Sequence, residues 1–183
     1  MEAIQNLLTR RSIRKYKPDM ISEEILTKII EAGIYAPTGM GRQSPIIIAV
    51  TDKKMRDKLS KMNAAVMGSN DDPFYGAPVV LVVLADKSIG TYKYDGSLVM
   101  GNLLNAAHAL GVSNCWIHRA KEVFDSAEGK QILDSLGIVG DYEGIGNCIL
   151  GYADCDTPPA KERKKNYVYF IKEGGILYAC GWH

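Results

Sequence analysis

Apolar residues recur along the chain at two spacings, and these spacings predict helices interleaved with strands. Runs rich in β-branched residues, bounded by Gly, Pro or charged residues, predict buried strands. Strands are expected over residues 46–50, 78–84, 112–117 and 145–152, with a short aromatic strand over 167–171. Helical spacing predicts helices over residues 3–8, 22–33, 52–62, 95–110 and 123–136.

Capping residues sharpen several of these boundaries. Ser22 is a good N-cap and is followed by two glutamates in the first turn, while Gly33 and Pro37 end that helix. Asp95 is expected to open the longest helix and Gly111 to stop it. This helix is apolar almost all round, so it should lie in the core. Residues 37–45, with two glycines and two prolines, should form a loop.

The alternation of elements predicts one α/β or α+β domain over residues 1–183, with a sheet covered by helices. The sequence shows no internal repeat. Residues 153–183 contain no helical pattern, although they carry several aromatic side chains. Such a tail needs a surface to pack on, and a partner subunit is the natural candidate.

Composition and charge exclude several classes of protein. Hydrophobic residues make up 46% and charged residues 23% of 183 residues, which argues against disorder. The net charge of +1 points neither to nucleic acid nor to a membrane surface. The first residues, MEAIQNLLTRR, lack the apolar run of a signal peptide, and no stretch is long enough to span a bilayer. A cytoplasmic protein is expected.

The cysteines suggest neither a disulfide framework nor a metal site. None of the four forms a CxxC pair, so reduced thiols are the default. Cys115 and Cys148 lie in apolar runs and should pack in the core. Cys115 with His118, and Cys180 with His183, have metal-like spacing, but neither has a second pair at zinc-finger distance. No metal is expected.

Two basic clusters are candidate anion sites. In an extended segment, Arg10, Ser12 and Arg14 share one face, where guanidinium forks and a hydroxyl could hold a phosphate. On spacing alone, a solvated basic stretch is the favoured interpretation, as it is for Lys161–Lys165. Neither a dinucleotide-binding GxGxxG nor a P-loop is present. His108, inside an apolar helix, reads as a core histidine, and no hydrolase-like set of catalytic residues occurs.

Four motifs in order resemble those of the nitroreductase family, and together they cover nearly the whole chain. The first is RRSIRKY at 10–16, and the second is APTGMGRQSP at 36–45. The third runs from DG at 95–96 through NLL at 102–104 and AA at 106–107 to LGVSNCWI at 110–117. The last is ILGY at 149–152, followed by Lys161-x-Arg163. With the two basic clusters in family order, the phosphate interpretation becomes the favoured one for both.

The resemblance implies an α+β fold with a mixed, largely antiparallel sheet flanked by helices, and an interlocked homodimer with FMN at its interface. The tail 153–183 would wrap the partner. It also implies a role for each matching residue. The phosphate and ribityl chain would be held by Arg10, Ser12 and Arg14, with Arg11 nearby. From the C-terminal end, the same phosphate would be reached by Lys161 and Arg163. The flavin would be lined from the partner chain by Pro37, Thr38 and Gly39, and Gln43 would address the polar edge of the ring system. Backbone groups near the reactive edge of the flavin would come from Trp116, Ile117 and His118.

The implied activity is transfer of reducing equivalents from NADH or NADPH to an electron-poor small molecule such as a nitroaromatic, a quinone or a flavin. A flavin-binding sensor or store without turnover is the alternative. Because the cofactor carries the chemistry, no catalytic side chain is named. Two departures from the family pattern affect the ring end of the site: Gly41 stands where Asn is common, and Ser44-Pro45 where Pro-Trp is common.

Overall fold

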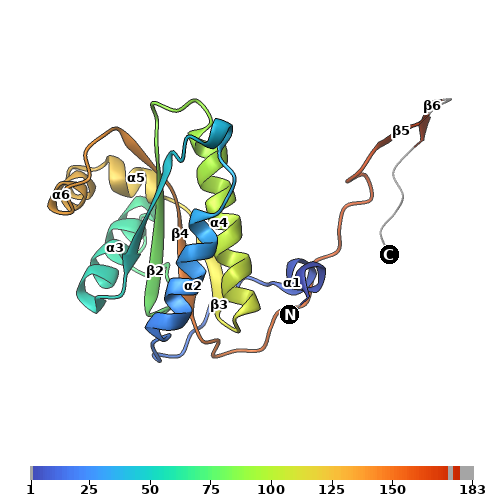
Figure 1. The fold of residues 1–183 in the computed structure, drawn as a ribbon. Coiled ribbons are helices and arrows are strands. Elements are labelled where there is room, and N and C mark those ends of the chain that lie inside the picture. The colour runs from blue at the N-terminus through green and yellow to red at the C-terminus, as the bar shows by residue number, and fades with distance from the viewer. Residues whose placement is uncertain (1, 173–174, 178–183) are drawn as a thin grey trace.

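A four-stranded antiparallel sheet forms the centre of the molecule in the computed structural model, which describes residues 2–172 and 175–177 (Figure 1). Its strands lie in the order β1-β2-β4-β3. Their bounds are β1 Pro45–Val50, β2 Val79–Asp86, β3 Ser113–Ile117 and β4 Tyr142–Gly151. A separate pair, β5 Phe170–Lys172 and β6 Gly175–Leu177, lies in the tail. The expected α+β class and antiparallel sheet are confirmed.

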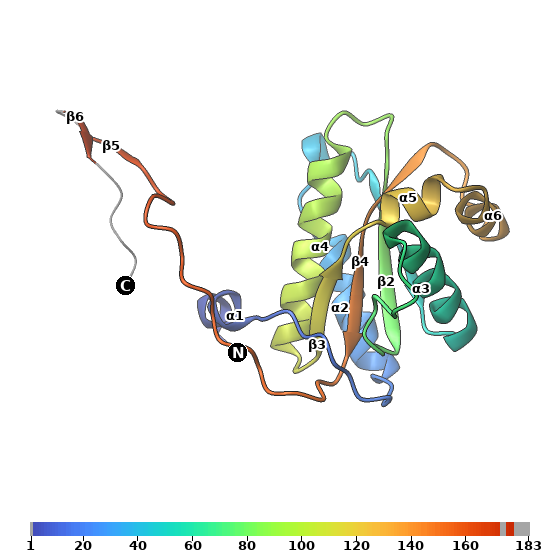
Figure 2. The same ribbon diagram turned by 180° about the vertical axis from the view of Figure 1, so that it is seen from behind.

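Helices cover both faces of this sheet, as Figures 1 and 2 show from opposite sides. Helices α2 and α4 pack on one face, and α3, α5 and α6 on the other. The bounds are α1 Ala3–Thr9, α2 Glu23–Ile34, η1 Gly39–Gly41, α3 Lys53–Met67, α4 Tyr92–Ala109, α5 Ala120–Asp125 and α6 Ala127–Ser135. The sheet thus separates two apolar layers.

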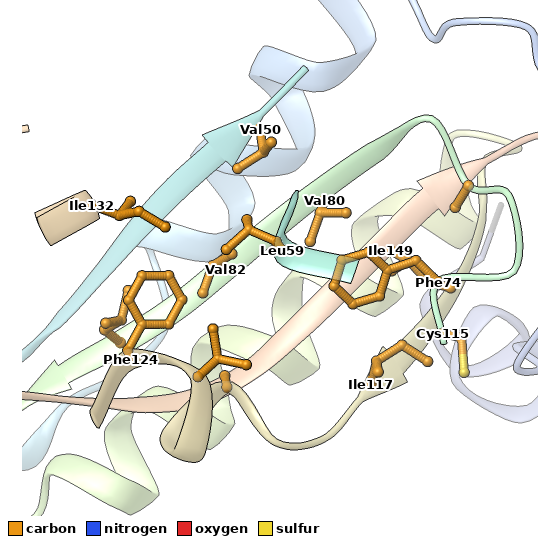
Figure 3. Packing of buried hydrophobic residues seen from close by; sticks show 14 of the residues in the cluster. Val50, Leu59, Phe74, Val80, Val82, Cys115, Ile117, Phe124, Ile132 and Ile149 are labelled. Carbon is orange, nitrogen blue, oxygen red and sulfur yellow. The ribbon is translucent and has the colours of Figure 1, made fainter. Parts of the chain in front are cut away.

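Strand β2 is buried on both faces, which explains why its sequence is apolar without alternation. Val80 and Val82 contribute to the cluster beneath α3, α5 and α6, which Figure 3 shows from close by. Leu81 and Val83 contribute to the opposite cluster, beneath α2 and α4. Because successive side chains of a strand point to opposite faces, a strand covered on both faces must be apolar at every position.

Most predicted boundaries are confirmed within a few residues. The Ser22 hydroxyl accepts from the Ile25 N–H at 3.3 Å and the Asp52 carboxylate from the Met55 N–H at 2.8 Å, so both act as N-caps. Helix α3 runs to Met67, beyond the predicted end at residue 62, and Gly68 closes it with φ of 66°. Strand β4 begins at Tyr142 and β5 only at Phe170, so the expected starts at 145 and 167 were wrong by three residues each.

The single helix expected over residues 123–136 is wrong, because α5 and α6 are separate. Ser126 has extended φ and ψ of −69° and 157°, and its hydroxyl caps α6 by accepting from the Gly129 N–H at 3.1 Å. A Cβ on Gly129 would stand 2.1 Å from the Val123 carbonyl oxygen. The tight corner therefore requires glycine there. The apolar periodicity alone did not reveal it.

Helix α4 also differs from its prediction. It begins at Tyr92, three residues before Asp95, and only one of its faces is buried. Leu98 is 47% exposed and Tyr94 74% exposed. An apolar helix with an uncovered outer face lies at the surface of this chain and not wholly in its core.

The N-terminal segment runs beside the edge strand β3. Ser12 forms an isolated parallel bridge with Asn114, and Tyr16 an antiparallel bridge with Ala153. The Asp154 N–H donates to the Lys15 carbonyl oxygen at 3.0 Å, and the two side chains form an ion pair. Beyond this point the tail leaves the body of the molecule past α1 (Figures 1 and 2). Among the described residues, no helix has the length and apolarity needed to cross a bilayer.

Candidate active site

Backbone hydrogen bonding fixes the basic segment, residues 10–14, to the edge strand β3 of the sheet. The Ile13 N–H donates to the Asn114 carbonyl oxygen at 3.0 Å, and the Ile13 side chain is buried in the core. The Arg10 guanidinium donates to the Asn114 Oδ1 at 3.3 Å. Asn114 is itself buried and donates to the Leu104 carbonyl oxygen at 3.0 Å. The segment is therefore an ordered edge and not a loosely solvated stretch.

The three arginines of this segment have different surroundings. Arg10 lies at Asn114, whereas Arg11 turns back and donates from Nη1 to the carbonyl oxygens of Leu8 and Arg10, both at 2.8 Å. Arg11 thereby satisfies carbonyl groups at the C-terminal end of α1. Arg14 is exposed and lines a cavity. Arg10 and Arg14 thus have different surroundings, and their joint role at one phosphate stays a prediction.

The cavity beside Arg14 has a volume of about 320 Å³. One side is formed by the end of β3 and the following turn, residues 116–119, and the other by the end of α3 and the loop 69–75. Three of the predicted ring contacts, Trp116, Ile117 and His118, are in its lining. A wider hollow of about 550 Å³ runs along α3, but its lining includes no residue of the basic segment. The smaller cavity is therefore the candidate ring site.

Two buried asparagines hold the turn after β3 in place. The Asn63 Nδ2 donates to the His118 carbonyl oxygen at 2.8 Å, and its Oδ1 accepts from the Arg119 Nε at 3.0 Å. The Asn147 Nδ2 donates to the carbonyl oxygens of Ile117 and His118, each at 3.3 Å. Arg119 has φ of 72°, a left-handed conformation that is uncommon for a non-glycine residue. The turn is thus rigid where a cofactor edge would meet it.

A second predicted segment, the loop 37–45, is organised by Asp95 from α4. Asp95 is 2% exposed, and it accepts from the Gly39 N–H at 2.9 Å and from the hydroxyls of Ser44 at 2.8 Å and Thr91 at 3.0 Å. Burial by itself raises the pKa of Asp95, but these hydrogen bonds outweigh it, and the pKa ends below its ordinary value. Asp95 therefore anchors this loop from the first turn of α4, whereas the sequence had predicted that the helix begins at Asp95.

The two departures in the loop have structural explanations. Gly41 has φ of 66°, and Asn is the other residue that adopts this left-handed conformation readily. Ser44 is buried and supplies one of the hydroxyls on Asp95. Pro37, Thr38, Gly39 and Gln43 all lie in this exposed or half-buried loop, at the far end of α4 from the basic segment. Within one chain, the structure does not bring them to the cavity.

The C-terminal basic residues are likewise apart from the N-terminal ones. Lys161 and Arg163 are exposed in the extended tail, and no hydrogen bond or ion pair joins them to residues 10–14 in the described part of the chain. Within one chain, the predicted site residues therefore lie in four places: the basic segment, the cavity, the loop 37–45 and the tail.

The cavity lining contains none of the other described candidates, His108, Cys115, Cys148 and Cys155. The Thr9 hydroxyl lies 2.9 Å from the His108 Nε2, and burial followed by Arg10 and Arg11 lowers the pKa of this imidazole. Cys115 and Cys148 are buried, as expected, and burial raises the pKa of the Cys148 thiol far above its ordinary value. Cys155 is exposed, while Cys180 and His183 lie outside the described residues. No group of three metal-binding side chains occurs in the described ranges.

Sequence reasoning missed the residues that support the site. The segments of the site are positioned by four polar residues, Asn63, Asp72, Asn114 and Asn147. Asn114 stands in one of the family motifs but was given no role, and the other three lie outside the motifs. The available signal was a polar residue interrupting an apolar run, as Asn147 does in β4. A buried polar group in such a run must be hydrogen-bonded, so it marks a backbone segment that needs support.

Comparison with known proteins agrees with this architecture. Residues 7–73 match the model of the nitroreductase family. A protein of Archaeoglobus fulgidus, provisionally named NADH dehydrogenase/NAD(P)H nitroreductase, is 35% identical over 157 residues, covering 82% of this chain and 85% of its own. A Methanothermobacter thermautotrophicus protein of the same provisional name is 31% identical over 120 residues, or 63% of this chain and 60% of that protein.

A solved structure shows the same fold over nearly the full length. The crystal structure of a Bacteroides fragilis nitroreductase with bound FMN superposes with a TM-score of 0.85 at 26% identity, covering 94% of this chain and all of that one. Fold and relatives together define an α+β oxidoreductase. The chain belongs to the nitroreductase family, which confirms the resemblance read from its motifs.

Proposed function

We propose that the protein is an FMN-dependent oxidoreductase that transfers reducing equivalents from NADH or NADPH to an electron-poor small molecule. The observation that carries this proposal is the ordered basic segment beside β3, which leads directly into the cavity formed by Arg14 and residues 116–119. The Bacteroides fragilis structure with bound FMN and the nicotinamide-dependent name of the Archaeoglobus fulgidus relative support the cofactor and the donor.

The donor set of the segment fits a flavin mononucleotide. A single terminal phosphate carries close to two negative charges and calls for cations and neutral donors, which Arg10 and Ser12 offer at the sheet edge. Arg14 supplies a further cation at the cavity, near the place of a ring system. In this proposal, the tail brings Lys161 and Arg163 to the same phosphate and so completes its binding site. No pyrophosphate-binding fingerprint is present, which favours FMN over FAD.

The protein's own part in the reaction is binding and orientation. When bound, FMN supplies the capacity to take a hydride from a nicotinamide and pass it on. The chain contributes a positive charge at Arg14, where it would favour a negatively charged ring edge. It also contributes a rigid turn at residues 117–119, held by Asn63 and Asn147. With a quinone acceptor, the net reaction consumes NAD(P)H, one proton and the quinone, and releases NAD(P)⁺ and the hydroquinone.

A homodimer completes the site in this proposal. The outer face of α4 exposes Leu98, and α1 exposes Ile4, Leu7 and Leu8. The tail exposes Tyr167, Tyr169 and Ile171, more apolar surface than a monomer ordinarily leaves in water. A partner covering these surfaces would bring its loop 37–45 to the cavity, and the tail 153–183 would wrap around it. Residues 1–183 would then act as a single domain in each subunit.

The first test is the visible spectrum of the purified protein, with mass spectrometry of the released cofactor. FMN should be found; FAD, or no flavin after reconstitution, would contradict the proposal. Addition of NADH or NADPH under anaerobic conditions should bleach the flavin absorption band at least as fast as the enzyme turns over. Addition of a quinone should then restore the band. Bound flavin that neither donor bleaches would identify a sensor or store instead. Sedimentation should show a dimer.

A further inference from the structure

Tyr75 forms an apolar wall of the cavity together with Met67 and Pro73. The opposite side carries Arg14 and the turn with His118 and Arg119. Asp71 and Asp72 also line the cavity, but the Asp72 carboxylate is paired with Arg56, outside it. Both sides of the cavity are therefore mixed: Arg14 and Arg119 lie beside Trp116 and Ile117 on the β3 side, and the apolar wall of Tyr75, Met67 and Pro73 lies beside Ser69 and Asp71 on the loop side.

The Asp72 carboxylate accepts four hydrogen bonds around the loop that carries Tyr75. Asp72 Oδ1 accepts from the Ser60 hydroxyl at 2.6 Å and from the Phe74 N–H at 3.0 Å. Its Oδ2 accepts from the Arg56 Nη2 at 2.6 Å and the Gly76 N–H at 2.7 Å. Burial raises the pKa of Asp72, but these four bonds outweigh it and leave the pKa lowered, so the carboxylate stays ionised at neutral pH.

Phe74 fixes the direction of the neighbouring ring. It is fully buried in the cluster that Figure 3 shows, and the Arg56 guanidinium lies 5.4 Å from its ring centre. With Phe74 anchored inward, Tyr75 is directed outward and remains 40% exposed. Its position is thus determined by the core on one side and by Asp72 on the other.

Backbone strain also points to this residue. Tyr75 has φ of 53°, a conformation that costs a tyrosine on the order of 1–3 kcal/mol. In the described part of the chain, four non-glycine residues have positive φ: Met40, Gln43, Tyr75 and Arg119. Two lie in the loop 37–45 and two line the cavity. Strain of this kind persists where the surrounding structure enforces it, and it gathers at ligand sites.

From this geometry we infer that Tyr75 binds the electron acceptor, and that its ring selects flat conjugated molecules such as quinones and nitroaromatics. The inference rests on the proposed function, because it places the acceptor beside an FMN ring in the same cavity. A rigid aromatic side chain loses little conformational freedom when another ring stacks on it. Together with Met67 and Pro73 it offers a broad apolar surface, which a compact, strongly hydrated acceptor such as ferricyanide cannot use.

The test compares ring removal with ring retention in the FMN-loaded protein. Tyr75→Ala removes the ring but keeps a Cβ, so the strained backbone is unchanged in kind. Tyr75→Phe keeps the ring. Val66→Ala, at a half-exposed residue of the α3 end that is absent from the cavity lining, is the control. Binding of menadione to the oxidised protein is measured by calorimetry without any electron donor, and flavin content by absorbance.

Loss of a stacked ring, about 0.5–1.5 kcal/mol, converts to a rise of about 2- to 12-fold in the dissociation constant for menadione in Tyr75→Ala. In Tyr75→Phe and in Val66→Ala, the dissociation constant for menadione should stay within about twofold of that of the unsubstituted protein. Turnover of NADH with ferricyanide should be unchanged in the control variant Val66→Ala, which lies outside the cavity lining.

An unchanged menadione affinity in Tyr75→Ala that retains its FMN would overturn the inference and leave the proposed function intact. Loss of FMN from this variant would also overturn it, because Tyr75 would then belong to the cofactor site. If the unsubstituted protein binds no FMN, the proposed function itself fails. The flavin absorbance separates these cases.

Discussion

Ser12 and Asn114 pair in a parallel bridge, although the four-stranded sheet to which Asn114 belongs is antiparallel throughout. The bridge lays the basic segment along the outer edge of β3. The Asn114 side chain reinforces it by accepting from Arg10 and donating inward to the Leu104 and Val112 carbonyl oxygens. One buried amide thus links the basic segment to the core.

Replacing this amide should weaken both folding and cofactor binding. Asn114→Ala leaves two buried carbonyl groups without their donor and releases Arg10, so we expect a loss of about 1–3 kcal/mol in unfolding free energy. Chemical denaturation measures it, and fluorescence titration with FMN measures the affinity. Asn105→Ala is the control, because this amide donates only to Gly101 within its own helix. Equal effects in the two variants would show that Asn114 has no special role.

Comparing the binding of FMN with that of riboflavin should distinguish the roles of Arg10 and Arg14. Each substitution to alanine should weaken FMN binding by about 1.5–3 kcal/mol, the range for hydrogen bonds to charged groups. Riboflavin lacks the phosphate. Arg10→Ala should therefore leave riboflavin affinity unchanged, whereas Arg14→Ala, which alters the cavity, should reduce the affinity for both ligands.

The control for the arginine variants is Lys54→Ala, an exposed cation on α3. It should change neither affinity. If both arginine variants bind FMN as the unsubstituted protein does, the basic segment has no part in the phosphate site. If both lose FMN and riboflavin equally, the separation between a phosphate end and a ring end is wrong.

Asp95→Asn should loosen the loop 37–45 in a pH-dependent manner. The amide oxygen cannot accept all three hydrogen bonds, so we expect a loss of about 1–3 kcal/mol at neutral pH. The pKa of Asp95 is lower in the folded protein than in the unfolded chain, where it is about 3.9. Its stabilising effect is therefore present above that value and is lost as the pH falls through the folded-state pKa.

Urea denaturation between neutral and strongly acidic pH tests this prediction. The difference in unfolding free energy between the protein and Asp95→Asn should shrink below about pH 4. Asp134→Asn, on the exposed side of α6, should show almost no difference at any pH. A constant difference across the range would mean that the charge of Asp95 contributes nothing to the stability of the loop.

Truncation tests the role of the tail. Ending the chain after Asp156 keeps the bridge between Tyr16 and Ala153 and the ion pair between Lys15 and Asp154, but removes Lys161 and Arg163. We expect loss of both dimerisation and flavin, measured by sedimentation and absorbance. The double variant Lys161→Ala with Arg163→Ala should lose flavin affinity while remaining a dimer. A truncated dimer with full flavin content would contradict the wrapping role.

The sequence predicted elements far better than it predicted the places where segments meet. Periodicity located the four main strands, because an apolar run between punctuating residues has few alternatives. It missed the corner at Ser126, since two short helices share one apolar stripe across it. It also misread Asp95, whose partners Gly39 and Ser44 lie more than fifty positions away. Contacts of that range depend on the assembled sheet.

The same limit applies to the site. Family motifs identified Arg14 and residues 116–118, which do meet in one cavity. They also grouped Arg10 with Arg11, although Arg11 turns to the end of α1. A string of arginines fixes their order but not their directions, which follow from local acceptors such as the Leu8 carbonyl oxygen. Tyr75 and Asp72 carried no signal, because a tyrosine and an aspartate in a loop are ordinary.

The position of Trp116, between strand β4 and the cavity, has an optical consequence. A Cβ on Gly146 would stand 2.5 Å from the Trp116 Nε1, so the indole approaches backbone that carries no side chain. Trp116 is one of two tryptophans in the chain, and it borders the cavity. Indole emission overlaps flavin absorption, so energy transfer would dim Trp116 whenever a flavin occupies that cavity. The protein would then report its own cofactor loading through its intrinsic fluorescence, with no label attached.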